Sequence, residues 1–134
     1  MRVAGIDLDF SEFDEFTARL EKLPAETVKN VRTAVEVSAR AVKDDARSRA
    51  SKIGGHARHY PRSIHYTMLG SKDAITAEIG PEDMGGRQGP LGPLLEDGTP
   101  TSAPHPHLKP ALQDAKEDFE HGLEKAIGDG LEAL

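Results

Sequence analysis

The spacing of hydrophobic residues predicts two amphipathic helices. The positions that recur in the first are Val28, Val31, Val35, Ala39, Val42, Ala46 and Ile53. They form one face of a long helix that follows Pro24 and stops at the glycines at 54 and 55. The positions that recur in the second are Leu108, Ala111, Leu112, Ala115, Phe119, Leu123, Ala126 and Ile127. Because Pro110 fits only in a first turn, this helix begins at residues 107 to 109; we expect it to fray near Gly128 and Gly130.

Between these helices the period of the pattern changes to two. The runs "SIHYTMLG" and "AITAEIG", separated by residues 71–73, predict a β-hairpin. Its inward positions are Ile64, Tyr66 and Met68 on one strand and Ile75, Ala77 and Ile79 on the other. A two-stranded hairpin is not stable alone in water. It must therefore pack on the long helix, or pair with the N-terminal segment or a neighbouring subunit.

The N-terminal segment and the centre of the chain complete the predicted fold. Alternating hydrophobic residues over 3–10 indicate a short strand, and Ser11 is placed to cap a helix that reaches Leu23. Residues 81–93 are rich in glycine and proline without a period, which predicts a loop. The result is an α+β fold in a single domain, 1–134: a long helix in the N-terminal half, a short antiparallel hairpin or small sheet, Pro/Gly-rich loops and a C-terminal amphipathic helix.

Residues 92–112 form a stiff bridge between the hairpin and the last helix. We expect Leu94 and Leu95 to anchor its start in the core. Gly98 in "EDGT" suits a turn that requires positive φ. Prolines at 100, 104 and 106 keep the following residues extended, so little entropy is lost if they dock on a partner.

Composition narrows the function classes. A chain of 134 residues with formal net charge −6 is a poor general binder of phosphate backbones, which requires an excess of Lys and Arg. The absence of cysteine excludes disulfides and thiolate metal sites. No hydrophobic run is long enough to span a bilayer, and "MRVAGIDLDF" lacks a secretory signal, so we expect a protein made in the cytoplasm with no membrane contact.

The sequence contains few candidates for catalytic or metal-binding residues. Two histidine pairs, "HARH" at 56–59 and "HPH" at 105–107, invite a metal hypothesis, but neither has the helical spacing of a zinc hydrolase. No serine has a nucleophile-elbow context and the glycines match no nucleotide-binding motif. We therefore predict no enzyme, no cofactor and no metal site. On the first helix Arg40, Lys43, Arg47 and Arg49 either form a solvated face or meet an acidic partner or nucleic acid.

The order of these parts resembles a family of phage proteins. Leu95, Glu96, Gly98 and Thr99 match an aliphatic-Glu-x-Gly-Thr segment, and "PHLKPAL" at 106–112 matches a P-x-x-x-P-A-L signature. Arg62, Ser63 and Ile64 match an element at the start of the hairpin. Over residues 25–127 the chain is similar to the small tail-completion, or head-to-tail joining, proteins of long-tailed double-stranded DNA phages.

The resemblance implies a structural virion protein of the tail or neck that forms a ring, expected to be a hexamer. Its implied partners are itself, other head-tail connector proteins and tail-tube proteins, with only passive contact with DNA in the lumen. On this hypothesis the hairpin, residues 62–80, joins neighbouring subunits, and loops over 81–107 contact adjacent rings. The candidate interface residues are Arg62, Ser63, Ile64, Leu95, Glu96, Gly98, Thr99, Pro104, His105, Pro106 and His107. A small metal-binding enzyme and a cytoplasmic adaptor remain the alternatives.

Overall fold

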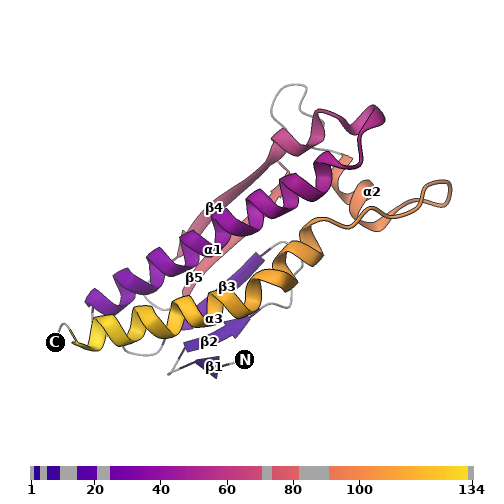
Figure 1. Ribbon diagram of the computed structural model, residues 1–134. Coiled ribbons are helices and arrows are strands. Elements are labelled where there is room, and N and C mark those ends of the chain that lie inside the picture. The colour runs from indigo at the N-terminus through magenta and orange to yellow at the C-terminus, as the bar shows by residue number, and fades with distance from the viewer. Residues whose placement is uncertain are drawn as a thin grey trace.

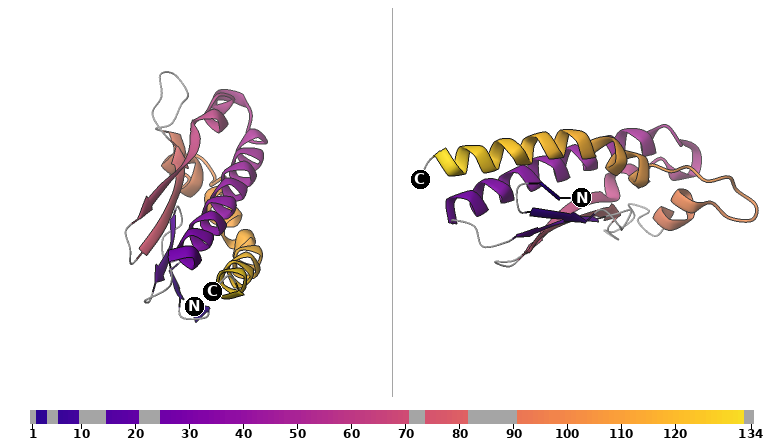
Figure 2. Two further views of the ribbon diagram at one scale, coloured as in Figure 1. Left: turned by 90° about the vertical axis from the view of Figure 1, so that its left-hand side faces the viewer. Right: turned by 90° about the horizontal axis from the view of Figure 1, so that it is seen from below.

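The computed structural model describes residues 2–3, 6–9, 15–20, 25–70, 74–81 and 91–132. Its elements in chain order are β1 (Arg2–Val3), β2 (Ile6–Asp9), β3 (Glu15–Leu20), α1 (Ala25–Ser51), the 3₁₀ turns η1 (Gly55–Ala57) and η2 (Tyr60–Ser63), β4 (Ile64–Gly70), β5 (Ala74–Pro81), α2 (Gly92–Asp97) and α3 (Leu108–Glu132). They form two layers, with α1 and α3 side by side on one face of an antiparallel sheet (Figures 1 and 2). The fold is α+β, as the sequence predicted.

The sheet has five strands in the order β1-β2-β3-β5-β4. The hairpin prediction is confirmed, because Tyr66 lies opposite Ile79 and Met68 opposite Ala77. The three-residue connection, 71–73, lies outside the described residues. β3 pairs with β5, so the hairpin is completed by the N-terminal segment, one of the possibilities left open by the sequence.

The predicted helix over residues 11–23 is wrong, because β3 occupies Glu15–Leu20. Phe16 and Ala18 alternate along this strand and are buried, with Phe16 opposite Ala77 and Ala18 opposite Ile75. The ring of Phe16 lies 4.9 Å from that of Phe119 on α3. Pairing with β5 and burial under α3 therefore outweigh the local capping signal at Ser11. Ser11 itself lies outside the described residues.

α1 confirms most of the first helical stripe, but Val28 is only half-buried and Ile53 lies beyond the end of the helix. Its buried residues are Thr27, Val31, Val35, Ala39, Val42, Ala46 and Ala50. These small side chains let α1 lie close to the sheet, where they meet Ile64, Ile75 and Ile79. The helix ends at Ser51, and Gly54 and Gly55 follow with φ of 64° and 59°, values that favour glycine.

α3 begins at Leu108, as predicted, with Pro110 in its first turn. Leu112, Phe119, Leu123 and Ile127 are buried in the shared core. The helix continues to Glu132 through Gly128, where fraying was expected. Burial of one continuous hydrophobic face supports the helix beyond the point at which propensity alone would end it.

A second correction concerns the start of the bridge. The residues expected to form a loop up to 93 include the beginning of α2, Gly92–Asp97, while 82–90 lie outside the described residues. Leu94 is 53% exposed and does not anchor the core, whereas Leu95 is half-buried against it. Adjacent residues of a helix point in different directions, and in α2 Leu95 faces the core while Leu94 does not. Within the described part of the chain, no helix has the length and hydrophobicity needed to cross a membrane.

Candidate assembly surface

The sheet ends at β4, whose outer side pairs with no other described strand. At seven residues, β4 is much longer than β1, the two-residue strand at the opposite edge. An exposed edge of this length presents backbone N–H and C=O groups that can pair with another chain. Leu69 adds an exposed hydrophobic side chain to this strand, with 48% of its surface accessible.

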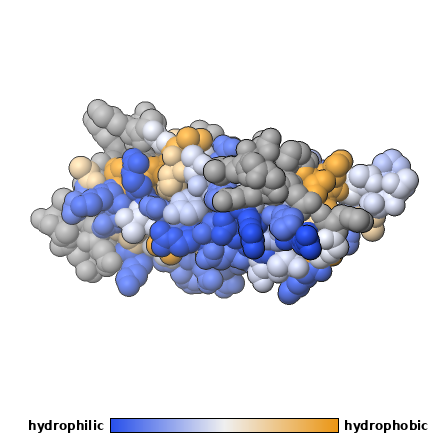
Figure 3. Space-filling view, turned by 90° about the horizontal axis from the view of Figure 1, so that it is seen from above, coloured by the Kyte–Doolittle hydropathy of each residue, from blue (hydrophilic) through white to orange (hydrophobic). Residues whose placement is uncertain are grey.

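A row of polar side chains from α1 lies along β4. Arg47 donates through Nε to the carbonyl oxygen of Ile64 at 2.8 Å. The hydroxyl of Tyr66 donates to Glu36 at 3.1 Å, and the Lys43 ammonium lies 5.6 Å from the centre of the Tyr66 ring. Figure 3 faces this side of the molecule, where hydrophilic residues form a broad band beside separate hydrophobic areas. The flank of α1 and the edge of β4 thus form one mixed surface.

A second exposed feature is the arm, residues 98–106, which projects from one end of the molecule (Figures 1 and 2). Its turn is closed by reciprocal backbone hydrogen bonds between Thr99 and Ser102, at 2.9 and 3.2 Å. At its base, the amide of His105 donates to the carbonyl oxygen of Leu95 at 2.6 Å. Residues 100–106 are all exposed. The arm is therefore ordered by its own backbone and not by burial.

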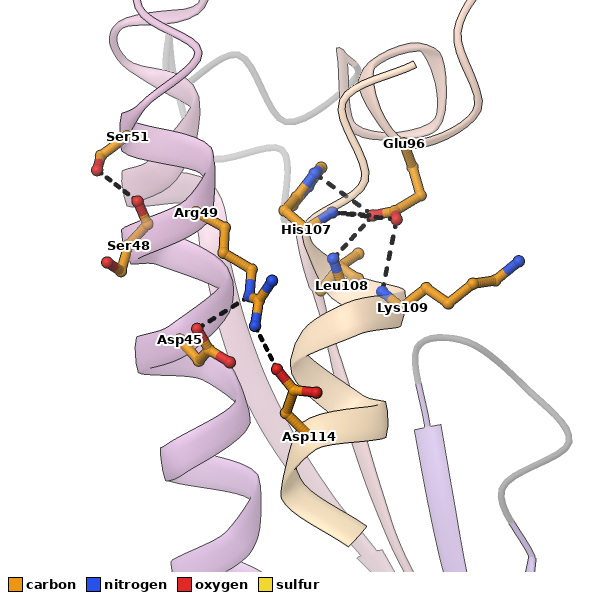
Figure 4. A network of polar contacts seen from close by, with 9 residues as sticks. All are labelled: Asp45, Ser48, Arg49, Ser51, Glu96, His107, Leu108, Lys109 and Asp114. Carbon is orange, nitrogen blue, oxygen red and sulfur yellow. Dashed lines mark hydrogen bonds and ion pairs between the residues drawn. The ribbon is translucent and has the colours of Figure 1, made fainter.

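Glu96 fastens the two ends of the arm together (Figure 4). The side chain is buried, and its carboxylate accepts the backbone N–H groups of His107, Leu108 and Lys109 at distances of 2.9 to 3.4 Å. These donors are the residue just before α3 and the first two residues of the helix, where intrahelical acceptors are lacking and the helix dipole favours negative charge. The next residue is Pro110, which has no N–H to satisfy. We call this set of contacts the Glu96 clasp.

His107 extends the Glu96 clasp to η2. Its Nδ1 lies 2.9 Å from the carbonyl oxygen of His105, which can only accept, so Nδ1 carries the proton. Nε2 then accepts from the hydroxyl of Tyr60 at 2.7 Å. Both side chains are fully buried. Burial raises the pKa of Tyr60 above its ordinary value of 10.0, and the nearby charge of Glu96 raises it further.

Two glycines permit the close approaches around the clasp. A Cβ on Gly92 would lie 2.5 Å from Cγ of Pro81 and 3.0 Å from the Tyr60 hydroxyl. Gly98 ends α2 with φ of 77°, and a Cβ there would lie 2.8 Å from the nitrogen of Pro104. Gly98 thus satisfies both the positive φ and the tight packing of the turn, as "EDGT" predicted.

The predicted interface residues divide into two groups. Exposed or half-exposed are Arg62, Leu95, Gly98, Thr99, Pro104, His105 and Pro106. Buried are Ser63, Ile64, Glu96 and His107. The exposed group stays a prediction for contact. The buried group supports the fold from inside, and the expectation that His107 is a contact residue on the arm is corrected by its burial.

Sequence reasoning missed two sets of contacts. Tyr60 bonds His107 across 47 positions of the chain, a separation that local patterns do not reveal. The placement of Glu36 and Lys43 beside Tyr66 likewise depends on how α1 lies over the hairpin. The signals available in hindsight are a lone tyrosine at the start of a 3₁₀ turn and a polar side of α1 distinct from its buried stripe.

The histidines of the two pairs whose side chains the structure describes, His59, His105 and His107, do not form a metal centre with one another. His107 uses both ring nitrogens internally, and Nε2 of His59 lies 3.1 Å from Nε of Arg58. No group of three or more potential ligands in metal-binding geometry occurs among the described residues.

Comparison with known proteins identifies the family. Residues 14–98 match the family model described as "Bacteriophage HK97-gp10, putative tail-component". The match covers β3, α1, the hairpin and α2, and it ends at Gly98, before the "PHLKPAL" segment. No curated protein and no solved structure matches the chain significantly. The chain therefore belongs to the family of bacteriophage HK97 gp10 and is a structural phage tail protein.

Proposed function

We propose that the protein completes the phage tail at the head-to-tail interface and assembles there as a homo-oligomeric ring. The observation that supports this proposal most is the unpaired edge of β4 in a protein of a tail-component family. A ring of identical subunits requires two different surfaces on each subunit, and an open sheet supplies two different edges. The subunit needs no catalytic group for this role, and its partners are further copies, connector proteins and tail-tube proteins.

The arm suits contact with the next ring of the tail or neck. Residues 99–104 contain no ionisable side chain in a chain with 30% charged residues. Prolines at 100, 104 and 106 and the Thr99–Ser102 bonds restrict the arm before it binds. Docking a restricted segment costs less conformational entropy than docking a free one. The Glu96 clasp sets the direction in which the arm leaves the body of the subunit.

The experiment is removal of the gene from the phage or prophage that contains it, followed by electron microscopy of the particles. We expect filled heads and unattached tails, with joining restored by the protein supplied in trans. Mass spectrometry of complete particles should also detect the protein in the virion. Normal joined particles without the gene, or virions lacking the protein, would contradict the proposal.

A further inference from the structure

The two edges of the sheet differ in charge as well as in length. Beside β4, the flank of α1 away from α3 presents Lys29, Arg32, Glu36, Arg40, Lys43 and Arg47. These positions follow one another at helical spacing. Three of them contact β4 directly, through Tyr66 and the carbonyl of Ile64. The β4 edge is therefore bordered by a predominantly basic surface, which we call the basic flank.

On the opposite side of the molecule, acidic side chains outnumber basic ones. α3 lies over the β1 side of the sheet (Figure 1) and contacts β1. Its residues Asp114 and Asp118 are on the side that faces α1, where Arg49 pairs with Asp114 at 2.5 Å. Helical spacing puts Glu117, Glu120 and Glu124, together with Lys109 and Lys116, on the side that faces away, and the three glutamates are exposed or half-exposed. We call these three the acidic flank.

This difference distinguishes two ways of extending the sheet. Pairing β4 with β4 of a second copy would place two basic flanks against each other, and like charges in contact oppose association. Pairing the β4 edge with the β1 edge of a second copy would place the basic flank against the acidic flank. In this arrangement the sheets of the two copies lie edge to edge, and α1 of one copy lies beside α3 of the next.

We propose that subunits join head to tail, with the β4 edge and basic flank of one copy against the β1 edge and acidic flank of the next. The partner is a second copy of this chain. A contact of this kind closes into a ring or continues as a filament, and it excludes a symmetric dimer through β4. The inference rests on the proposed ring and specifies which surfaces form it.

The test is charge reversal on each flank, with self-association followed by sedimentation velocity at low salt. Lys29→Glu with Arg32→Glu and Arg40→Glu reverses the net charge of the basic flank, and Glu117→Arg with Glu124→Arg reverses that of the acidic flank. All five residues are exposed, so folding should be unaffected, which circular dichroism checks. Each charge-reversal variant should raise the concentration needed for assembly by at least about tenfold, because attraction becomes repulsion at one side of every contact.

Mixing the two charge-reversal variants provides the decisive step. Each has like charges on both flanks, so neither assembles alone, but the two together should alternate and restore assembly to near the wild-type concentration. Lys52→Glu with Arg58→Glu is the matched control, because both residues are exposed and lie outside the basic flank. This control should assemble like the wild type.

Three outcomes would overturn the inference. These are a wild type that stays monomeric, charge-reversal variants that assemble normally, and mixtures of the two variants that fail to recover assembly. A loss of DNA binding in the basic-flank variant with assembly intact would instead assign that flank to nucleic acid. None of these results affects the gene-removal experiment, so the tail-joining proposal is tested separately.

Discussion

The Glu96 clasp and the β4 edge differ in whether their backbone polar groups have hydrogen-bond partners within the subunit. In the clasp, the free N–H groups of the first turn of α3 are satisfied by a buried carboxylate from α2. Along β4, the outer backbone groups face away from the sheet without a partner strand among the described residues. Glu96 therefore maintains the subunit from inside, while the unpaired edge of β4 is the surface that we propose for self-assembly.

The largest expected loss of stability comes from removing the carboxylate of the Glu96 clasp. Glu96→Ala leaves buried N–H groups without an acceptor and removes a negative charge from the helix terminus, so unfolding should cost about 2–3 kcal/mol less. Chemical denaturation would measure the change. Asp97→Ala is the matched control, because Asp97 is adjacent but exposed, and it should change stability little. Equal losses for both variants would refute the role of the clasp.

Gly98→Ala should destabilise the protein by about 1–2 kcal/mol, because alanine is strained at positive φ. Its Cβ would also meet backbone atoms of Ser102 and Pro104, which cannot move without opening the arm. Gly122→Ala provides the comparison within α3, where no heavy atom lies within 4 Å of the added Cβ. That variant should be neutral or slightly more stable. Thermal melts of both variants check the pair.

Tyr60→Phe should cost about 1 kcal/mol at neutral pH, because Nε2 of His107 loses its buried donor. The pKa of Tyr60 is raised in the folded state, so its neutral hydroxyl contributes stability below pH 10 that is lost as pH rises through the higher folded value. The gap between wild type and variant should therefore shrink above about pH 10. Denaturation across pH 7–12, with Tyr66→Phe as the control, measures it; a constant gap would contradict the assignment.

A substitution on the β4 edge should have the smallest effect on stability and a large effect on self-association. Leu69→Lys places a charge on the exposed edge strand and should alter unfolding by no more than about 0.5 kcal/mol. It should nevertheless weaken self-association. Val37→Lys changes another exposed hydrophobic residue, 58% accessible, on α1 away from the edge. Light scattering should show weakened association for Leu69→Lys alone.

Much of the fold follows from the sequence, because α1, α3 and the hairpin each bury one face and repeat with a clear period. β3 was missed because its two buried positions, Phe16 and Ala18, are too few to outweigh a nearby helix signal. α2 was missed because a six-residue helix has no measurable period. The roles of Glu96 and His107 depend on contacts with elements 11 to 47 positions away, which no local pattern encodes.

Hydrogen exchange of the free and assembled protein tests the central claim most directly. The amides of His107, Leu108 and Lys109 should be protected in both states, because Glu96 binds them within one subunit. Outward amides of β4 should exchange rapidly in the free subunit and become protected on assembly. If β4 exchange is unchanged on assembly while the amides at the start of α3 gain protection, the two regions have the reverse of the roles assigned to them.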